Sequence, residues 1–402
     1  MISQSRTDSD IFAVGYVDGS IRLWDSKTGT VVVSFNGHKS AVSALAWDES
    51  GTRLASGGRD AHIIVWDLIA EVGLYRLRGH KDQITGLEFL RHSEDDGDDT
   101  MRDATDGAGW ILSTGKDTLI KLWDLSTQHC VETHVAHHGG CWTMALMPDH
   151  RGCITAGQDG EMKVWSTDTQ NLESRASSGV DCLVDRGTLY RQFRDRTASI
   201  NFHPDGNFFA VHGIDKNVEI WRIRSADEVQ KAMKRKRKRK EQKGERVEDN
   251  EGIIAASIGD IFVSYVVVRS GGKVKTVDWA VKPRGKGSDL ELLVSCTNNS
   301  LEFYTIQRQG EKKAVELPEY NKLYSVELPG HRTDIRSVSL STDDRMLASA
   351  SNGSLKIWNV RTGICIRTFE CGYALCCSFL PGDKIVSPSR TLAVSEAANW
   401  LK

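Results

Sequence analysis

Proline and long apolar runs are scarce in this sequence. There are seven prolines among 402 residues, and no stretch approaches the roughly 18 apolar residues that a membrane-spanning helix requires. Residues 1–10 are polar, so we expect no secretory signal peptide there. The net charge of −2 predicts no particular partner. With 39% apolar and 26% charged residues, the chain has the composition of a globular protein without a membrane partner.

Cysteine pairs and catalytic motifs are also missing. The cysteines are odd in number and include no C-x-x-C pair, so the sequence predicts free buried thiols in a reducing compartment rather than a zinc site or a disulfide framework. No phosphate-binding loop, metal-ligand spacing or unique nucleophile–base set occurs. We therefore expect no enzyme: no catalytic residue, no metal, no cofactor and no small-molecule substrate. The nine cysteines are Cys130, Cys141, Cys153, Cys182, Cys296, Cys365, Cys371, Cys376 and Cys377.

Tryptophan, by contrast, is abundant, and six of the eleven tryptophans end a repeated pattern. In this pattern an aspartate or asparagine stands six residues before an aromatic residue. The intervals from Trp24 to Trp66 and from Trp123 to Trp165 are both 42 residues, which indicates a repeat architecture. The pairs are Asp18–Trp24, Asp60–Trp66, Asp117–Trp123, Asp159–Trp165, Asp215–Trp221, Asn352–Trp358 and a weaker Asn298–Tyr304.

Short strand patterns fill each repeat. In the plainest unit, residues 41–47, 54–57, 62–66 and 75–77 are apolar, alternating or β-branched, and tight-turn residues separate them. Helical periodicity occurs only around residues 225–245. The period, the Gly-His pairs and the Trp-Asp ends resemble the WD-repeat family. The resemblance implies an all-β fold, a WD-repeat β-propeller of about seven blades with four antiparallel strands each.

The same resemblance implies a hydrogen-bonded relay inside a blade, from a loop histidine through a hydroxyl and a turn aspartate to a tryptophan. Such polar groups are costly to bury unless they are paired. A hydrolase triad uses similar residue types, but this set occurs three times at the repeat spacing, so we assign it a structural role. The predicted relays are His38/Ser56/Asp60/Trp66, His80/Ser113/Asp117/Trp123 and His137/Thr155/Asp159/Trp165.

Two charged insertions interrupt the repeat. Residues 93–109 carry seven acidic residues and are typical of an exposed loop, with docking of a basic partner as the alternative. Within residues 222–255, residues 231–243 hold nine lysines or arginines. Nuclear import, contact with RNA phosphates and a plain solvated helix all fit this run. Its unbroken part is Lys234, Arg235, Lys236, Arg237, Lys238, Arg239 and Lys240.

The repeat pattern is incomplete at both ends. Residues 11–15 have the pattern of a second strand, so the first unit lacks an inner strand. Residues 373–379 have the pattern of an inner strand, and we expect them to complete the first blade and close the ring, because closure protects sheet edges. An open fragment is the alternative. We expect one propeller over residues 1–386 and an irregular tail over residues 387–402.

Several stretches resemble one branch of the family more closely. They are residues 73–82, 116–130, 373–376 and 381–383, together with the basic insertion between the fifth and sixth units. They resemble the WD-repeat subunit of the U3 small nucleolar RNP and small-subunit processome, which has tandem propellers and a C-terminal helical domain. The resemblance implies that this chain is a fragment covering the first propeller region, as from a truncated gene model.

This resemblance implies a non-catalytic scaffold in the nucleus and nucleolus. Its surfaces would hold other processome proteins, including further WD-repeat subunits, and the basic insertion would contact snoRNA or pre-rRNA. The supported process would be pre-rRNA processing for 18S rRNA and 40S ribosome biogenesis. The alternative is a generic WD-repeat adaptor of a ubiquitin ligase or a chromatin complex, since one fold serves many functions.

Overall fold

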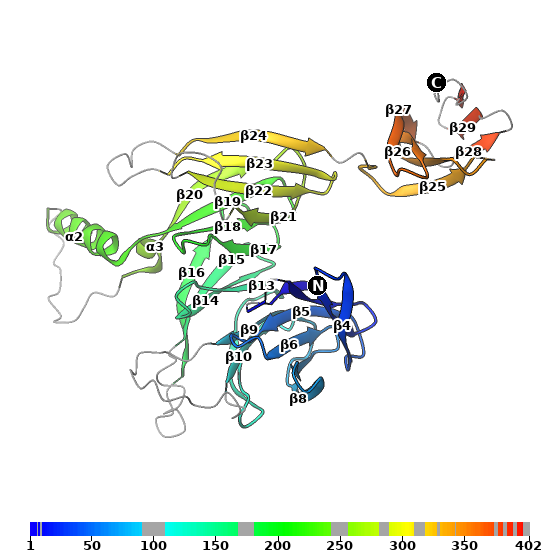
Figure 1. The fold of residues 1–402 in the computed structure, drawn as a ribbon. Helices are drawn as coiled ribbons and strands as arrows, with labels where there is room; N and C mark the ends of the chain where they lie inside the picture. Colours follow the sequence, from blue (N-terminus) through cyan, green and yellow to red (C-terminus); the bar gives the residue numbers. More distant parts are fainter. Residues whose placement is uncertain are drawn as a thin grey trace. The chain divides into compact units, whose positions relative to one another are not determined.

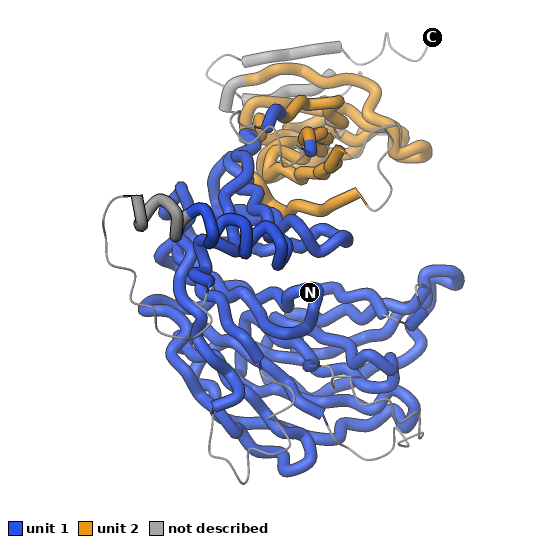
Figure 2. The backbone as a smooth tube through the Cα atoms, turned by 90° about the vertical axis from the view of Figure 1, so that its left-hand side faces the viewer, with its two compact units in different colours: residues 1–269, 308–319 blue, residues 270–307, 320–402 orange. Residues whose placement is uncertain are grey.

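The chain forms two compact units, which Figure 2 shows in different colours. Unit 1 comprises residues 1–269 and 308–319, and unit 2 comprises residues 270–307 and 320–402. The computed structural model describes residues 1–5, 7–8, 10–90, 109–167, 181–242, 256–280, 289–308, 318–327, 330–341, 343–373, 377–380, 384–388 and 392–396. Of the acidic insertion 93–109, all but the last residue lies outside these ranges, so the role of that insertion stays a prediction.

The described part of unit 1 contains five antiparallel sheets of four strands, and consecutive strands are neighbours in each sheet (Figure 1). The first two sheets are β1 (Ile2–Gln4), β2 (Ile11–Gly15), β3 (Ser20–Asp25) and β4 (Thr30–Asn36), then β5 (Val42–Trp47), β6 (Arg53–Gly58), β7 (His62–Asp67) and β8 (Val72–Arg78). The third is β9 (Ile84–Leu90), β10 (Trp110–Gly115), β11 (Leu119–Asp124) and β12 (His129–Val135). The fourth is β13 (Cys141–Leu146), β14 (Gly152–Gly157), β15 (Glu161–Thr167) and β16 (Leu183–Tyr190). The fifth is β17 (Ser199–Phe202), β18 (Phe208–His212), β19 (Asn217–Ile223) and β20 (Phe262–Arg269).

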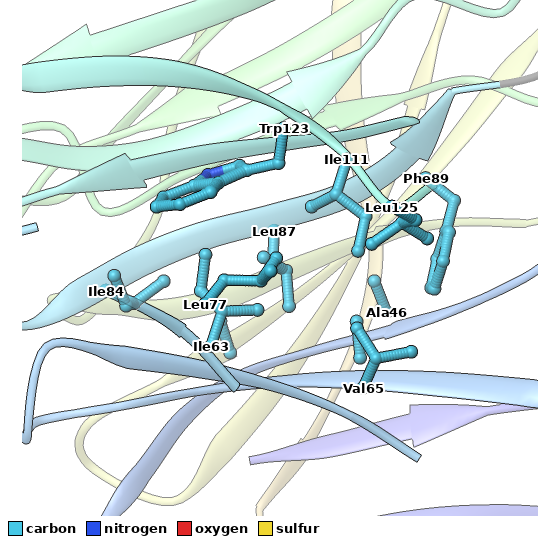
Figure 3. Packing of buried hydrophobic residues seen from close by; sticks show 12 residues of the cluster. Ala46, Ile63, Val65, Leu77, Ile84, Leu87, Phe89, Ile111, Trp123 and Leu125 are labelled. Atoms are coloured by element: carbon cyan, nitrogen blue, oxygen red, sulfur yellow. The ribbon is translucent and has the colours of Figure 1, made fainter. Parts of the chain in front are cut away.

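The apolar core of unit 1 lies between successive sheets. Ile63 and Leu77 of the second sheet pack against Ile84, Ile111 and Trp123 of the third, as Figure 3 shows. Similar clusters join the first sheet to the second, the third to the fourth, and the fourth to the fifth. The middle strands are therefore covered by neighbours on both faces, which explains apolar runs such as residues 63–66 of β7. No sheet in this series has a core of its own.

Unit 2 contains one four-stranded and two three-stranded sheets among the described residues. Their strands are β21 (Val274–Trp279), β22 (Leu290–Cys296), β23 (Ser300–Ile306) and β24 (Tyr320–Glu327), then β25 (Ile335–Leu340), β26 (Met346–Asn359) and β27 (Cys365–Tyr373), then β28 (Ser378–Leu380), β29 (Lys384–Pro388) and β30 (Leu392–Glu396).

The long strand β26 turns back on itself. Its first part pairs with β25 and its second part pairs with β27. Trp358 Nε1 donates to Ser349 Oγ over 2.8 Å, although nine residues of extended chain would separate them by roughly 30 Å. Gly353 lies between them with a φ of 92°, a conformation that favours glycine. The two parts of β26, together with β25 and β27, therefore supply the four strands expected of one repeat.

The structure corrects the expectation for the first blade. The strand that pairs with β2 is β1, with Ile2 opposite Val14, so the polar N-terminal residues supply the missing inner strand. Ser3 O also accepts a hydrogen bond from Trp47 Nε1 of the next sheet over 3.2 Å. Backbone pairing does not require apolar side chains, so the polar residues at the N-terminus did not show the pattern of a strand.

The expected strand over residues 373–379 is also wrong. Tyr373 ends β27, opposite Asn352, whereas Ser378–Leu380 forms β28 and pairs with β29. The tail over residues 387–402 was expected to be irregular, but Leu392–Glu396 forms β30 and pairs with β29. Residues 392–396 pair through their backbone without the Asp-to-Trp marker, so the repeat pattern could not predict this strand; residues 389–391 and 397–402 of the tail lie outside the described residues.

Two helices follow β19, and both lie in unit 1. Helix α2 (Ala226–Gln242) carries the basic run, and α3 (Ile258–Ile261) is a single turn. The sequence predicted a helix around residues 225–245, and α2 lies within that range. No helix in the described ranges is long and apolar enough to span a membrane.

Candidate functional site

The predicted polar residues of the second sheet form one continuous relay. His38 lies 2.8 Å from Ser56 Oγ through Nε2 and 3.0 Å from Asp60 Oδ1 through Nδ1. Trp66 Nε1 donates to Ser56 Oγ over 2.8 Å, and Lys39 N donates to Asp60 Oδ2 over 2.9 Å. Burial lowers the pKa of His38. Burial opposes ionisation of Asp60, but the hydrogen bonds from Lys39 N and His38 outweigh it and lower its pKa.

The relay of the third sheet is connected from end to end. His80 lies 2.8 Å from both Ser113 Oγ and Asp117 Oδ2, and Trp123 Nε1 lies 2.7 Å from Ser113 Oγ. The indole nitrogen can only donate, and an ionised carboxylate can only accept. Trp123 therefore donates to Ser113, and His80 Nδ1–H donates to Asp117.

The relay of the fourth sheet is open at one end. Thr155 Oγ1 lies 3.1 Å from His137 Nε2 and accepts from Trp165 Nε1 over 3.0 Å. His137 Nδ1 is 3.7 Å from Asp159 Oδ1, beyond hydrogen-bonding distance, and this ring nitrogen has no hydrogen-bond partner within the described residues. Burial lowers the pKa of His137. All twelve predicted relay residues thus lie in three groups, one in each of three consecutive sheets.

Sequence reasoning missed a fourth relay, in the β25–β27 sheet. His331 Nε2 lies 2.6 Å from Ser349 Oγ, which also accepts from Trp358 Nε1. His331 Nδ1 faces two serines instead of an aspartate, Ser351 Oγ at 2.6 Å and Ser354 Oγ at 3.0 Å. The Gly-His pair and the Asn-to-Trp spacing were visible in the sequence, but the loss of the turn aspartate concealed the group. Burial lowers the pKa of His331.

The fifth sheet replaces the relay with a buried ion pair. Val211 stands where a hydroxyl is needed, and Trp221 Nε1 has no hydrogen-bond partner within the described residues. Arg191 Nε donates to Glu219 Oε1 over 3.2 Å, and both side chains are fully buried. Arg191 Nη1 also donates to Thr197 Oγ1 over 3.1 Å. Burial raises the pKa of Glu219, and the neighbouring Arg191 opposes that rise.

The His/Ser/Asp groups cannot act as hydrolase triads. The serine or threonine in each predicted group is completely buried and sits beneath a tryptophan that donates to it. A nucleophile must reach its substrate, and these hydroxyls have no exposed surface. The three groups therefore have a structural role, because they pair polar atoms that would be costly to bury alone.

The basic run lies on a helix whose start is well defined. Ser225 Oγ accepts from Glu228 N over 3.4 Å, and Glu228 Oε2 accepts from Ser225 N over 3.3 Å, which is the reciprocal pair of a capping box. Arg222 Nη2 donates to Glu228 Oε1 over 2.5 Å and connects this turn to β19. Lys234 and Arg235 are exposed, and residues 236–240 continue the helix backbone.

This placement suits a cationic arm. Val229 is buried and anchors the first half of α2, whereas the cations occupy the second half. Positive side chains near a helix C-terminus interact favourably with the helix dipole, and acidic residues in the first turn do so at the other end. The helix could therefore present its cations without unfolding.

The chain is similar to WD-repeat proteins. Residues 1–167 match the WDR3 first beta-propeller domain, and residues 322–359 match the WD domain, G-beta repeat. The chain is 42% identical to U3 small nucleolar RNA-associated protein 12 of Saccharomyces cerevisiae over 95% of its own length and 38% of that protein. It is 34% identical to WD repeat-containing protein 3 of Homo sapiens over 50% of its length and 21% of that protein.

The chain therefore spans well under half the length of these relatives. Three observations indicate the same kind of repeat. They are the family matches, the four-stranded antiparallel sheets and the relays inside those sheets. This chain carries WD repeats and is similar to U3 small nucleolar RNA-associated protein 12 and to WD repeat-containing protein 3.

Proposed function

We propose that the chain is a scaffold of the small-subunit processome that acts in pre-rRNA processing for 18S rRNA and in 40S ribosome biogenesis. The similarity to a U3 small nucleolar RNA-associated protein over 95% of the chain carries this proposal. The proposed location is the nucleus and nucleolus. The proposed partners are other processome proteins, including further WD-repeat subunits. We also propose that residues 1–386 form one propeller.

We further propose that α2 is the part that contacts snoRNA or pre-rRNA and directs nuclear import. Its seven consecutive cations lie on one helix that starts from a defined cap. Neutralised phosphates release counterions, so binding through α2 would weaken with salt. If all seven cations meet single-stranded phosphates, the logarithm of the binding constant would fall with a slope of roughly −5 against the logarithm of salt concentration.

The test replaces the cations with glutamine, which keeps the helix propensity of α2. We expect the seven-glutamine variant in cells to lose nucleolar accumulation and recovery of pre-rRNA. A second copy of this variant carries an unrelated import signal at one terminus. If that copy recovers pre-rRNA as well as the natural chain does, α2 acts in import only. If the first variant is unchanged in both readouts, the proposed role of α2 is wrong.

The alternative, a generic adaptor, makes a different prediction. A ubiquitin-ligase receptor would co-purify with cullin proteins, and a chromatin subunit would co-purify with histones. A processome scaffold would co-purify with U3 snoRNA and pre-rRNA. Purification of the natural chain under graded salt, followed by identification of RNA and protein, separates these readings.

A further inference from the structure

Strands β5, β9 and β13 of unit 1 each contain a β-bulge, and the bulged residue of β13 differs in kind from the other two. In β5 and β9 the bulged residue is a small hydroxyl residue that joins its sheet to the next one. Ser43 Oγ donates to Ile84 O over 2.6 Å, and Thr85 Oγ1 donates to Cys141 O over 2.9 Å. In β13 the bulged residue is Trp142, which cannot make this bond.

Two cations lie against the Trp142 ring instead. Lys116 Nζ is 4.4 Å from the ring centroid, and Arg196 Cζ is 4.1 Å from it. Lys116 follows β10 and Arg196 precedes β17, so the cluster joins loops of three consecutive sheets. The two cations can be no farther apart than the sum of these two distances. Both side chains are half-buried.

Neither cation has an ion-pair partner in the described part of the chain. Arg191, a few residues before Arg196, has the opposite surroundings and pairs with Glu219 and Asp195. In addition, Trp142 Nε1 and Arg196 Nε are buried and have no hydrogen-bond acceptor within the described residues. A buried donor without a partner is unfavourable, so an acceptor supplied by a partner would stabilise the cluster.

We propose that Lys116, Trp142 and Arg196 bind the carboxylate of an acidic side chain from a partner protein. A guanidinium group presents paired donors that match a carboxylate, and an ammonium group adds a point charge. Asp117 and Asp195 stand next to the two cations in the sequence, so the site lacks the excess of positive charge that a nucleic-acid backbone requires, which favours a protein carboxylate over RNA. This site is separate from α2 and does not rest on the proposed function.

The test measures binding of a labelled polyglutamate peptide by fluorescence anisotropy. The full-length chain used carries glutamine at residues 234–240, so the basic helix cannot bind the peptide. We expect binding, and we expect Lys116→Gln and Arg196→Gln each to weaken it about tenfold or more. Arg194→Gln is the matched control, because Arg194 is an exposed arginine in the same loop, and it should leave the affinity within about twofold.

A third variant tests the tryptophan without disturbing the fold. Trp142→Thr introduces the residue that β9 carries at its bulge, and it should weaken peptide binding while the thermal unfolding temperature changes little. A polyglutamine peptide and single-stranded polyuridine RNA are the competing probes. The proposal is overturned if polyglutamate does not bind, if Lys116→Gln and Arg196→Gln bind it as Arg194→Gln does, or if the RNA binds and the peptide does not displace it.

Discussion

Ser113 holds the relay of the third sheet together, and its removal gives the sharpest test of the relay's structural role. Its hydroxyl accepts from Trp123 and shares a hydrogen bond with His80 Nε2, and all three side chains are buried. Ser113→Ala leaves two buried polar groups without a partner. At about 1–3 kcal/mol for each such group, we expect the free energy of unfolding to fall by about 2–6 kcal/mol.

The assay is urea unfolding followed by tryptophan fluorescence, with native-state hydrogen exchange to localise the loss. Amides of β10 and β11 should exchange faster in Ser113→Ala, because the local opening free energy falls there first. The control is Ser50→Ala, which removes an exposed hydroxyl and should change stability by no more than about 0.5 kcal/mol. Ser113→Thr keeps the oxygen, as Thr155 does in the next sheet, and should retain most of the stability.

A double-mutant cycle separates the relay from simple packing. Trp123→Phe removes the indole donor, so Ser113→Ala should cost less in that background, with a coupling energy of about 0.5–3 kcal/mol. Additive effects of the two substitutions would refute the relay as a stabilising unit. So would a Ser113→Ala variant as stable as the Ser50→Ala control.

Three further predictions concern other buried groups and α2. Burial lowers the pKa of His38 and of His137 in the folded chain, so the unfolded chain binds more protons in mild acid. The stability that comes from keeping these histidines neutral is complete above the ordinary pKa of 6.5, and it is lost as the pH falls through the lower folded-state pKa. Urea midpoints should therefore fall between about pH 7.5 and about pH 5.5, and less so in a His38→Gln variant. Arg191→Met should lower the free energy of unfolding by about 3–5 kcal/mol, because it leaves a buried carboxylate unpaired, and the added change Glu219→Leu should restore much of the loss in the same urea assay. Equal stability of the single and double variants would contradict that reading. Glu228→Ala should increase hydrogen exchange in the first turn of α2, by an opening free energy of about 0.5–2 kcal/mol, whereas Asp227→Ala, which removes an acid outside the capping box, should change it less.

The sequence predicted the features that depend on local spacing. An aspartate in the turn of a hairpin and a tryptophan six residues later, near the end of the next strand, keep a fixed spacing, so the groups around Ser56, Ser113 and Thr155 could be found by counting. The helix carrying the basic run could be found in the same way, since its periodicity changes abruptly after β19.

The features that the sequence did not predict depend on backbone pairing or on neighbouring sheets. Strand β1 is polar, and a strand that pairs through its backbone alone leaves no apolar pattern. The relay around His331 exchanges an aspartate for two serines, one on each side of the turn within β26, which spacing cannot reveal. The position of Trp142 could not be predicted either, because it is defined by the bulges that β5 and β9 carry at the matching place.

The position of the core between sheets has a consequence for synthesis of the chain. When the ribosome has released the β9–β12 sheet, Leu112, Ile120 and Leu122 still lack the Trp165 side that will cover them. Each sheet therefore exposes one apolar face until the roughly 40 residues of the next repeat have emerged, which takes about a few seconds at typical elongation rates. During synthesis, the exposed apolar face is therefore always on the sheet that was made last, and we expect chaperones to bind there.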